Sequence, residues 1–250
     1  ALKGERSFSF RRRGLQSLEC GEGKNMGQPS IFVRTSLCNL HCSWCDTDYT
    51  WNWEGTRFTH DNDVLPGYRK FKKEDVIAEM KLEKVVEAIQ QYPCKNVILT
   101  GGEPMLQQPA LAALMQALGR NYWFEVETNG TLLPDPAFEA AIHQYNVSPK
   151  LSNSNNSQKL RERPKVYRYF AQSDKAHFKF VVANPAELEE VQDLIDRYAI
   201  KPSRVYLMPE GTNTERLAEK QAWLVEACKV HGFNFTSRLH IFIYGNKRGV

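Results

Sequence analysis

The sequence predicts an α/β protein that forms a partial, open (βα)6-type barrel. Short apolar segments rich in β-branched and aromatic residues alternate with longer segments whose apolar residues recur at helical spacing. Such alternation implies βαβ crossovers and therefore a parallel sheet. About six units follow one another, fewer than the eight of a closed barrel. We expect a single domain over residues 1–250, with reduced or modified helices and an insertion at 51–73.

Each predicted element has its own local signal. In the segment 82–89 the apolar residues fall at i, i+3, i+4 and i+7, which is typical of an amphipathic helix. Asp135 followed by Pro136 indicates the start of a helix. The pair Asn129-Gly130 is a turn signal, and the polar segment 151–157 is predicted to be a loop or linker. The predicted strands are 30–35, 96–100, 123–128, 178–182, 205–209 and 238–244, and the other predicted helices are 109–118, 135–145, 185–198 and 214–231.

The composition is ordinary for a soluble globular protein, with 42% hydrophobic and 25% charged residues. The net charge of +4 is mild, and we interpret the basic clusters at 11–13, 69–73 and 161–168 as solvated surface, because no nucleic-acid-binding motif accompanies them. No segment is long and apolar enough to cross a membrane, and no secretory leader is visible. We therefore expect a cytoplasmic protein that binds neither nucleic acid directly nor membranes. Cys94 and Cys228 are interpreted as buried small hydrophobes.

Three of the six cysteines, Cys38, Cys42 and Cys45, lie close together in the stretch CNLHCSWCDT. Such a trio points to metal chemistry in a reducing compartment rather than to disulfides. A structural zinc site takes four ligands, and His41 is a possible fourth, although its place next to Cys42 makes this awkward. A [4Fe–4S] cluster held by three thiolates leaves one iron open to a small-molecule ligand.

The spacing C-x3-C-x2-C resembles that of the radical S-adenosylmethionine superfamily, and Gly101-Gly102-Glu103-Pro104 follows a predicted strand as a similar turn does there. The resemblance implies the partial barrel fold of that superfamily. It also implies that S-adenosylmethionine chelates the open iron, and that an electron then releases a 5′-deoxyadenosyl radical. The protein's part in such chemistry is to bind the cofactor and the substrate, to orient them and to shield them. Glycines in the turn would let the backbone approach a ligand closely.

Further stretches resemble the 7-carboxy-7-deazaguanine synthase family over nearly the whole chain from about Ser17. The resemblance implies a Mg²⁺-dependent lyase that converts 6-carboxy-5,6,7,8-tetrahydropterin to 7-carboxy-7-deazaguanine and ammonia by radical ring contraction. This step belongs to the biosynthesis of queuosine, a tRNA modification, and of other deazapurines. A flavodoxin- or ferredoxin-type reductant and a homodimer are also implied. The stretches are 20–27, 31–34, 45–47, 125–130, 148–150 and 244–250.

The same resemblance assigns roles to single residues. Arg34 would bind the substrate carboxylate through its guanidinium, Thr47 would be a Mg²⁺ ligand, and Glu127 would hydrogen-bond the pterin ring. A surface arginine, a loop cap and a structural ion pair are the respective alternatives. The other implied substrate contacts are Glu19, Cys20, Gly21, Thr100, His240 and the terminal carboxylate of Val250. The implied S-adenosylmethionine contacts are Trp44, Asp46, Gly101, Gly102, Glu103, Ser148, Pro149, Lys150, Met208, Pro209, Glu210 and Gly211.

One position departs from the family pattern, because Cys20 stands where members usually carry Gln. A thiol is a weaker hydrogen-bond donor and acceptor than an amide, so recognition of one edge of the pterin is affected.

Two alternative functions share part of the sequence pattern. An activase for glycyl-radical enzymes carries the cysteines and the Gly-Gly-Glu-Pro turn, and a non-catalytic zinc-binding module is the other. The insertion at 51–73 is expected to be a lid or part of a dimer contact.

Overall fold

The computed structural model describes the backbone of residues 7–11 and 18–245 and the side chains of residues 21–245. Its strands are β1 (Ser7–Arg11), β2 (Leu18–Cys20), β3 (Pro29–Thr35), β4 (Ile77–Lys81), β5 (Asn96–Gly101), β6 (Trp123–Thr128), β7 (Gln144–Val147), β8 (Ala176–Val182), β9 (Val205–Pro209) and β10 (Asn234–Phe235). Its α-helices are α1 (Lys73–Val76), α2 (Leu82–Gln90), α3 (Gln108–Leu118), α4 (Pro136–Ala141), α5 (Gln158–Arg161), α6 (Pro164–Gln172), α7 (Glu187–Tyr198), α8 (Thr214–His231) and α9 (Leu239–Tyr244).

The strands form one open sheet in the order β10-β9-β8-β7-β6-β5-β3-β1-β4, with β2 paired to β3 off this path. All pairs from β3 to β10 along this order are parallel. The pairs that involve β1, β2 and β4 are antiparallel. β1 and β4 continue the sheet beyond β3, and β2 also pairs with β3. The predicted open α/β fold is therefore confirmed, and the antiparallel strands at one end were not predicted.

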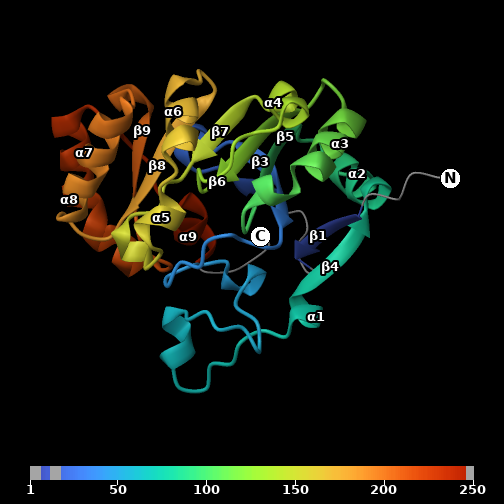
Figure 1. Cartoon of the computed structure of the whole chain (residues 1–250), viewed down its shortest axis with the longest axis horizontal. Helices are drawn as coiled ribbons and strands as arrows, with labels where there is room; N and C mark the ends of the chain where they lie inside the picture. Colours follow the sequence, from blue (N-terminus) through green and yellow to red (C-terminus); the bar gives the residue numbers. More distant parts are fainter. Residues whose placement is uncertain (1–6, 12–17, 246–250) are drawn as a thin grey trace.

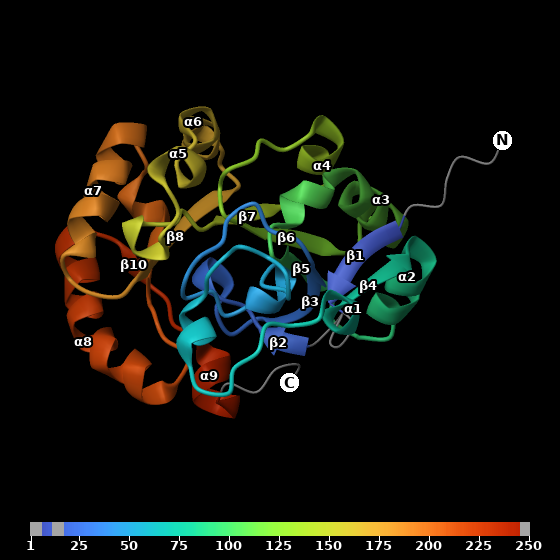
Figure 2. The same ribbon diagram turned by 60° about the horizontal axis from the view of Figure 1, so that its bottom comes forward.

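The sheet is curved, with its helices around the outside and the chain that follows β3 inside the curve (Figures 1 and 2). Side chains of a strand point alternately to its two faces. The outer face is apolar and packs under the helices, as Leu99, Val126 and Phe180 do. The inner face is largely polar, with Arg34 paired in register to Thr100. This division is typical of a parallel sheet that carries a functional site on its concave side.

The turn that follows β2 lies on the concave side of the sheet, against β6 and β7. Its Asn25 Nδ2 donates to Glu125 Oε1 at 2.5 Å, and Gln144 and Asn146 also donate to the Glu125 carboxylate. Glu125 is fully buried. Burial raises the pKa of Glu125, and the hydrogen bonds from the amides oppose this effect. The inner face is therefore closed at this end by a hydrogen-bonded polar network rather than by an apolar core.

Two predicted elements are wrong. The helix predicted over 135–145 ends at Ala141, and Gln144–Val147 forms strand β7 instead, because parallel pairing with β6 and β8 outweighs the local helical pattern. The strand predicted over 238–244 is helix α9. A short apolar run does not distinguish a helix from a strand by periodicity, and only the tertiary surroundings decide.

Other expectations were partly right. Cys228 is buried as expected, whereas Cys94 is only partly buried. In the cluster at 161–168, Arg161 is not solvated surface but is 7% exposed and forms an ion pair with Glu190 at 2.6 Å. The predicted loop at 151–157 includes the buried residues Leu151 and Ser154. Within the described part of the chain, no helix combines the length and apolar character needed to cross a bilayer.

The turn after β5 lies against the backbone that follows β3. Gly102 N donates to Thr35 O at 3.0 Å, and Glu103 N donates to Leu37 O at 2.8 Å. A Cβ on Gly101, whose φ is +119°, would lie 1.9 Å from Thr35 O, and one on Gly102 would lie 2.0 Å from Leu37 O. The two glycines therefore allow a backbone-to-backbone contact that leads directly into the cysteine loop.

Replacing Gly101 by alanine should destabilise the protein strongly. The new Cβ would clash with the backbone of Thr35, so we expect the free energy of unfolding in urea to fall by about 3 kcal/mol or more. Gly55→Ala is the matched control, because Gly55 also has a positive φ of +79° but a Cβ there would meet nothing within 4 Å. Its cost should be about 1–2 kcal/mol from backbone strain alone. Equal losses for both variants would contradict the close contact.

Candidate active site

A cavity of about 210 Å³ lies where the carboxyl ends of the parallel strands meet the cysteine loop. This is the edge of an α/β sheet at which ligands bind. The structure brings eighteen of the predicted residues into its lining. They are Arg34, Cys38, Cys42, Trp44, Cys45, Asp46, Thr47, Thr100, Gly101, Gly102, Glu127, Ser148, Lys150, Met208, Pro209, Glu210, Gly211 and His240.

Several predicted site residues do not line this cavity. Gly21, Glu103 and Pro149 are buried behind its wall. The Glu103 carboxylate accepts hydrogen bonds from Asn129 N at 2.7 Å, from Thr128 Oγ1 at 2.9 Å and from Met105 N at 3.0 Å. Burial raises the pKa of Glu103 to about 7, against the effect of these donors. Glu103 thus ties the end of β5 to the end of β6.

Three other predictions concern residues that the structure does not fully describe. Glu19 and Cys20 belong to β2, where they pair in register with Ser30 and Pro29, but their side chains lie outside the described part. Val250 also lies outside the described residues. The contacts predicted for these three residues stay predictions.

The three loop thiols suit an iron–sulfur cluster better than a single ion. All three line the cavity and form no disulfide. Among the residues whose side chains are described, no group of three or more His, Cys, Asp or Glu is arranged to hold one metal ion. In a cubane each thiolate binds a different iron, so the sulfurs need not converge on one point. Donors of this number and kind fit a [4Fe–4S] cluster with one open iron.

The pKa values of the thiols indicate that they would need a bound cation to ionise. Burial raises the pKa of Cys38, Cys42 and Cys45, the last to about 12, and the other thiols and nearby carboxylates add to the effect. Three thiolates in this place therefore require a cationic group that compensates their charge. The irons of a cluster supply such a charge.

His41 does not take part in this arrangement. Its ring is stacked on Phe58, with the centroids 3.4 Å apart, and it makes an edge contact with Trp51. Burial lowers the pKa of His41. It is absent from the residues that line the cavity. The structure therefore does not place His41 as a fourth ligand of a zinc site.

The segment 51–73 contacts the cysteine loop through its backbone and through His60. His60 is buried, and its Nε2 lies 2.7 Å from Cys45 O. Because its Nδ1 accepts from Asn62 N at 3.0 Å, the ring proton is on Nε2, which donates to the carbonyl of Cys45. Asp61 N also donates to Ser43 O at 2.7 Å. These bonds fix the backbone that carries two of the three thiols.

Residues near Lys150 form the side of the cavity next to the cysteines. Lys150 Nζ donates to Ser148 Oγ at 2.8 Å and lies 5.9 Å from the centre of the Trp44 ring. Trp44 Nε1 donates to Asn153 O at 3.0 Å, which orients the indole ring. Thr47 Oγ1 is 3.5 Å from Cys45 Sγ, so its hydroxyl lies beside the cluster site. An apolar ring, an ammonium group and hydroxyls are thus available to a ligand here.

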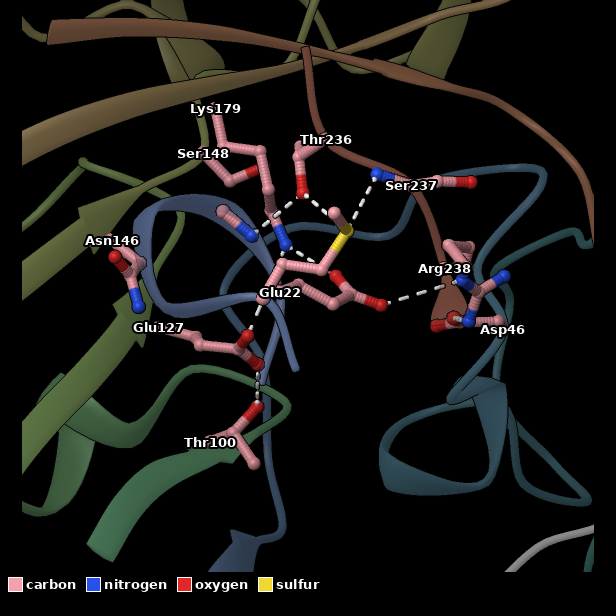
Figure 3. A network of polar contacts seen from close by, with 12 residues as sticks. Glu22, Asp46, Thr100, Glu127, Asn146, Ser148, Lys179, Thr236, Ser237 and Arg238 are labelled. Atoms are coloured by element: carbon pink, nitrogen blue, oxygen red, sulfur yellow. Dashed lines mark hydrogen bonds and ion pairs between the residues drawn. The ribbon is translucent and has the colours of Figure 1, made fainter. Parts of the chain in front are cut away.

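A row of alternating charges crosses the cavity wall (Figure 3). Glu127 on β6 faces Lys179 on β8 at 3.8 Å, and Lys179 Nζ lies 2.5 Å from Glu22 Oε2. On its other side Glu22 faces Arg238 Nε at 3.5 Å, and Arg238 pairs with Asp46 of the cysteine loop. The row therefore connects the strand that carries Glu127 with the loop that carries the thiols.

Sequence reasoning missed nine of the lining residues, and some of them carried a signal. Lys179 stands within the apolar strand FKFVV, where a lysine needs a partner. Glu22 belongs to the stretch 20–27 (CGEGKNMG), which carries part of the family resemblance. Its carboxylate is not among the site residues that the resemblance implies. Arg238 had no local signal, because Asp46 is distant in the sequence. The missed residues are Glu22, Phe32, Leu40, Thr128, Asn129, Lys179, Val181, Thr212 and Arg238.

Removing the imidazole of His60 should loosen the cysteine loop even without a metal. In metal-free His60→Ala we expect backbone amides of residues 38–46 to exchange with deuterium about tenfold faster, because a buried hydrogen bond to the loop is lost. Hydrogen exchange with mass spectrometry measures this. His231→Ala is the control, since His231 is exposed at the end of α8 and stacks on Phe233. Unchanged exchange in His60→Ala would contradict the bracing role.

Comparisons with known proteins agree with this geometry. The sequence model of the radical SAM superfamily matches residues 32–177. The 7-carboxy-7-deazaguanine synthase of Pyrobaculum aerophilum is 35% identical over 92% of this chain and 92% of its own length, and that of Halobacterium salinarum is 33% identical over 90% and 87%. The crystal structure of QueE from Escherichia coli has the same fold, with a TM-score of 0.62, 21% identity and coverage of 93% of this chain and 94% of that one. The chain belongs to the radical SAM superfamily and, within it, to the 7-carboxy-7-deazaguanine synthase family.

Proposed function

We propose that this enzyme converts 6-carboxy-5,6,7,8-tetrahydropterin to 7-carboxy-7-deazaguanine and ammonia in deazapurine biosynthesis. The observation that carries the proposal is one cavity that is lined both by three free thiols and by Arg34, Thr100 and Glu127 from the strands. Substrate and product differ by one molecule of ammonia, so the overall reaction requires no net oxidant or reductant. A lyase is therefore the class of enzyme proposed.

The chain's residues divide into those that hold the cofactors and those that hold the substrate. Members of the radical SAM superfamily use a [4Fe–4S] cluster and S-adenosylmethionine, which together supply a radical that abstracts hydrogen. Here Cys38, Cys42 and Cys45 would hold the cluster. The backbone at Gly101-Gly102, the Ser148–Lys150 pair and the chain at 208–211 surround the space for S-adenosylmethionine. The protein's part is to bind, orient and exclude water.

The strand wall of the cavity suits an anionic heterocycle. Arg34 lies on β3 with its guanidinium 5.0 Å from the centre of the Phe32 ring, and a guanidinium can bind a carboxylate through two parallel hydrogen bonds. Glu127 Oε2 accepts from Thr100 Oγ1 at 2.6 Å, which fixes the orientation of the carboxylate. An ionised carboxylate accepts hydrogen bonds from ring N–H groups. Thr47 is the proposed protein ligand of Mg²⁺, which takes most of its other ligands from substrate and water.

Membership of this family favours the substrate above over the alternatives. A glycyl-radical activase shares the cysteines and the Gly-Gly-Glu-Pro turn but is not what the relatives are named, and a zinc module is not supported by the donor arrangement. We further propose that the chain forms a single domain, that it is a homodimer and that a flavodoxin- or ferredoxin-type protein reduces it. A cytoplasmic location is proposed because a cluster with an open iron requires reducing surroundings.

Anaerobic reconstitution tests the proposed reaction. The protein is supplied with iron, sulfide, S-adenosylmethionine, Mg²⁺, a reductant and the carboxytetrahydropterin, and products are followed by chromatography with mass spectrometry. We expect a deazapurine product and an equal amount of ammonia. If 5′-deoxyadenosine forms without any deazapurine, the superfamily chemistry stands and the proposed substrate is wrong.

Replacing Arg34 should weaken substrate binding more than S-adenosylmethionine binding. Loss of a charge-assisted pair is worth about 1.5–3 kcal/mol, so Arg34→Ala should raise the KM for the pterin by roughly 10- to 100-fold. Arg34→Lys should restore part of this loss, because it keeps the charge without the bidentate geometry. The control is Arg168→Ala, because Arg168 is exposed beside Tyr198 on the outer helices. Normal turnover of Arg34→Ala at low substrate would remove Arg34 from the carboxylate site.

A further inference from the structure

We propose that Lys179 is a positioning residue that keeps the carboxylate of Glu22 ionised beside that of Glu127, so that both accept hydrogen bonds from N–H groups of the bound heterocycle. The inference rests on the proposed function, because that function supplies a heterocycle with an amino group and ring N–H donors. It adds a residue on β8, a strand in which no site residue was predicted.

The geometry places one ammonium between two carboxylates. Lys179 Nζ lies 2.5 Å from Glu22 Oε2 and 3.8 Å from Glu127 Oε1 (Figure 3). Its side chain is 10% exposed, and those of Glu22 and Glu127 are 14% and 21% exposed. All three residues line the cavity. The two acids come from different elements, the turn after β2 and strand β6, so Lys179 also holds these elements together.

Both acids are oriented as well as neutralised. Thr100 Oγ1 donates to Glu127 Oε2 at 2.6 Å, which leaves Oε1 on the side of Lys179. The second oxygen of Glu22, Oε1, lies 3.5 Å from Arg238 Nε and 3.9 Å from His240 Nδ1. Each carboxylate is therefore held at one oxygen by a partner of its own, while Lys179 faces the other oxygen. A ligand that enters from the cavity meets two oriented carboxyl groups.

The surrounding charges make Lys179 necessary for this state. Burial by itself would raise the pKa of Glu22, but Lys179 and then Arg238 and His240 outweigh it and hold this pKa at about 2. Glu22 and Glu127 raise the pKa of Lys179 against the effect of burial. Arg238 lies on the far side of Glu22 and pairs with Asp46.

Strand β6 adds no positive charge to this site. Glu125 precedes Glu127 by two positions on that strand, is fully buried and accepts from amides. Glu127 raises the pKa of Glu125 further. Without Lys179, Glu22 and Glu127 would share a poorly solvated region as like charges. The pKa of the Glu22 carboxyl would then rise toward the neutral range, because burial would act after its largest opposing charge is lost.

Protonation would change what the pocket recognises. An ionised carboxylate only accepts hydrogen bonds, whereas a protonated one also donates from one oxygen. If the O–H of a protonated carboxyl faces a ring N–H group, two hydrogen-bond donors meet and neither has an acceptor. Leaving both unpaired in a buried place costs free energy. Removing the charge of Lys179 should therefore make binding of the heterocycle depend on pH, with weak binding at low pH and recovery as pH rises.

The test measures equilibrium binding of 6-carboxypterin, a fluorescent oxidised analogue, to the metal-free protein, so the readout does not require the loaded enzyme. Binding is measured from about pH 5.5 to about pH 8, and the dissociation constant of each variant is divided by that of the wild type at the same pH. Protonation of the ligand itself affects both constants equally and cancels in this ratio. We expect Lys179→Met to bind on the order of tenfold more weakly near pH 7 and to recover at higher pH, a shift of about one unit or more. Lys179→Arg should stay within about threefold of wild type, because it keeps the charge.

Two further variants separate this role from a structural one. In the double variant Lys179→Met with Glu22→Gln, the amide at position 22 cannot take up a proton, so the pH dependence should return toward that of the wild type. Lys175→Met is the matched control, because Lys175 precedes β8 and pairs with Glu139 at 2.9 Å, and neither residue lines the cavity. It should leave binding unchanged. If Lys179→Met fails to fold by circular dichroism, Lys179→Gln carries the same expectation.

The outcomes distinguish this inference from the proposed function. A pH-independent loss of affinity in Lys179→Met, or a pH profile equal to that of the wild type, would overturn the role of Lys179 while pterin binding by the wild type stands. If the wild type neither binds the carboxypterin nor turns over the tetrahydropterin, the proposed function fails first. A pH-dependent loss that the Glu22→Gln change relieves would support the inference.

Discussion

The site depends on one backbone contact, the approach of Gly101 and Gly102 to the chain that leaves β3. Two hydrogen bonds, from Gly102 N to Thr35 O and from Glu103 N to Leu37 O, extend the parallel pairing of β3 and β5 beyond the strands themselves. Leu37 then adopts a left-handed conformation, with φ +74°, immediately before Cys38. A non-glycine residue in this conformation costs free energy, so its surroundings must hold it there. The direction of the cysteine loop is set at this point.

The surroundings of the loop consist of elements from distant parts of the chain. Glu103 connects the β5 turn to Thr128 and Asn129 at the end of β6. The segment 51–73 contacts the loop through His60. The turn at 151–157 contributes Ser154, whose carbonyl accepts from Ser43 N at 3.2 Å. A loop with little regular structure is thus held from three sides, which is what a cluster site requires for a defined geometry.

The concave side of the sheet is costly to build. Lys179, Glu22 and Arg238 are all largely buried, and buried ion pairs seldom add net stability because their charges must leave water. An apolar core of the same volume would serve stability as well or better. The polar inner face is therefore best explained by what it binds, whereas the apolar outer face under the helices accounts for the stability of the fold. The division between these two tasks follows the alternation of side chains along each strand.

The sequence by itself determined the parallel α/β architecture, because alternating strand and helix patterns depend on local periodicity. It also singled out the cysteine trio as a short motif after a predicted strand, and the resemblance to a known family supplied most of the other cavity residues. Tertiary structure alone decided that 144–147 is a strand and 239–244 a helix, since neighbouring elements outweigh weak local preferences there. It also decided the row of charges from Glu127 to Asp46. The members of that row come from five segments as far apart as residues 22 and 238, and a single sequence contains no signal for pairs at such separation.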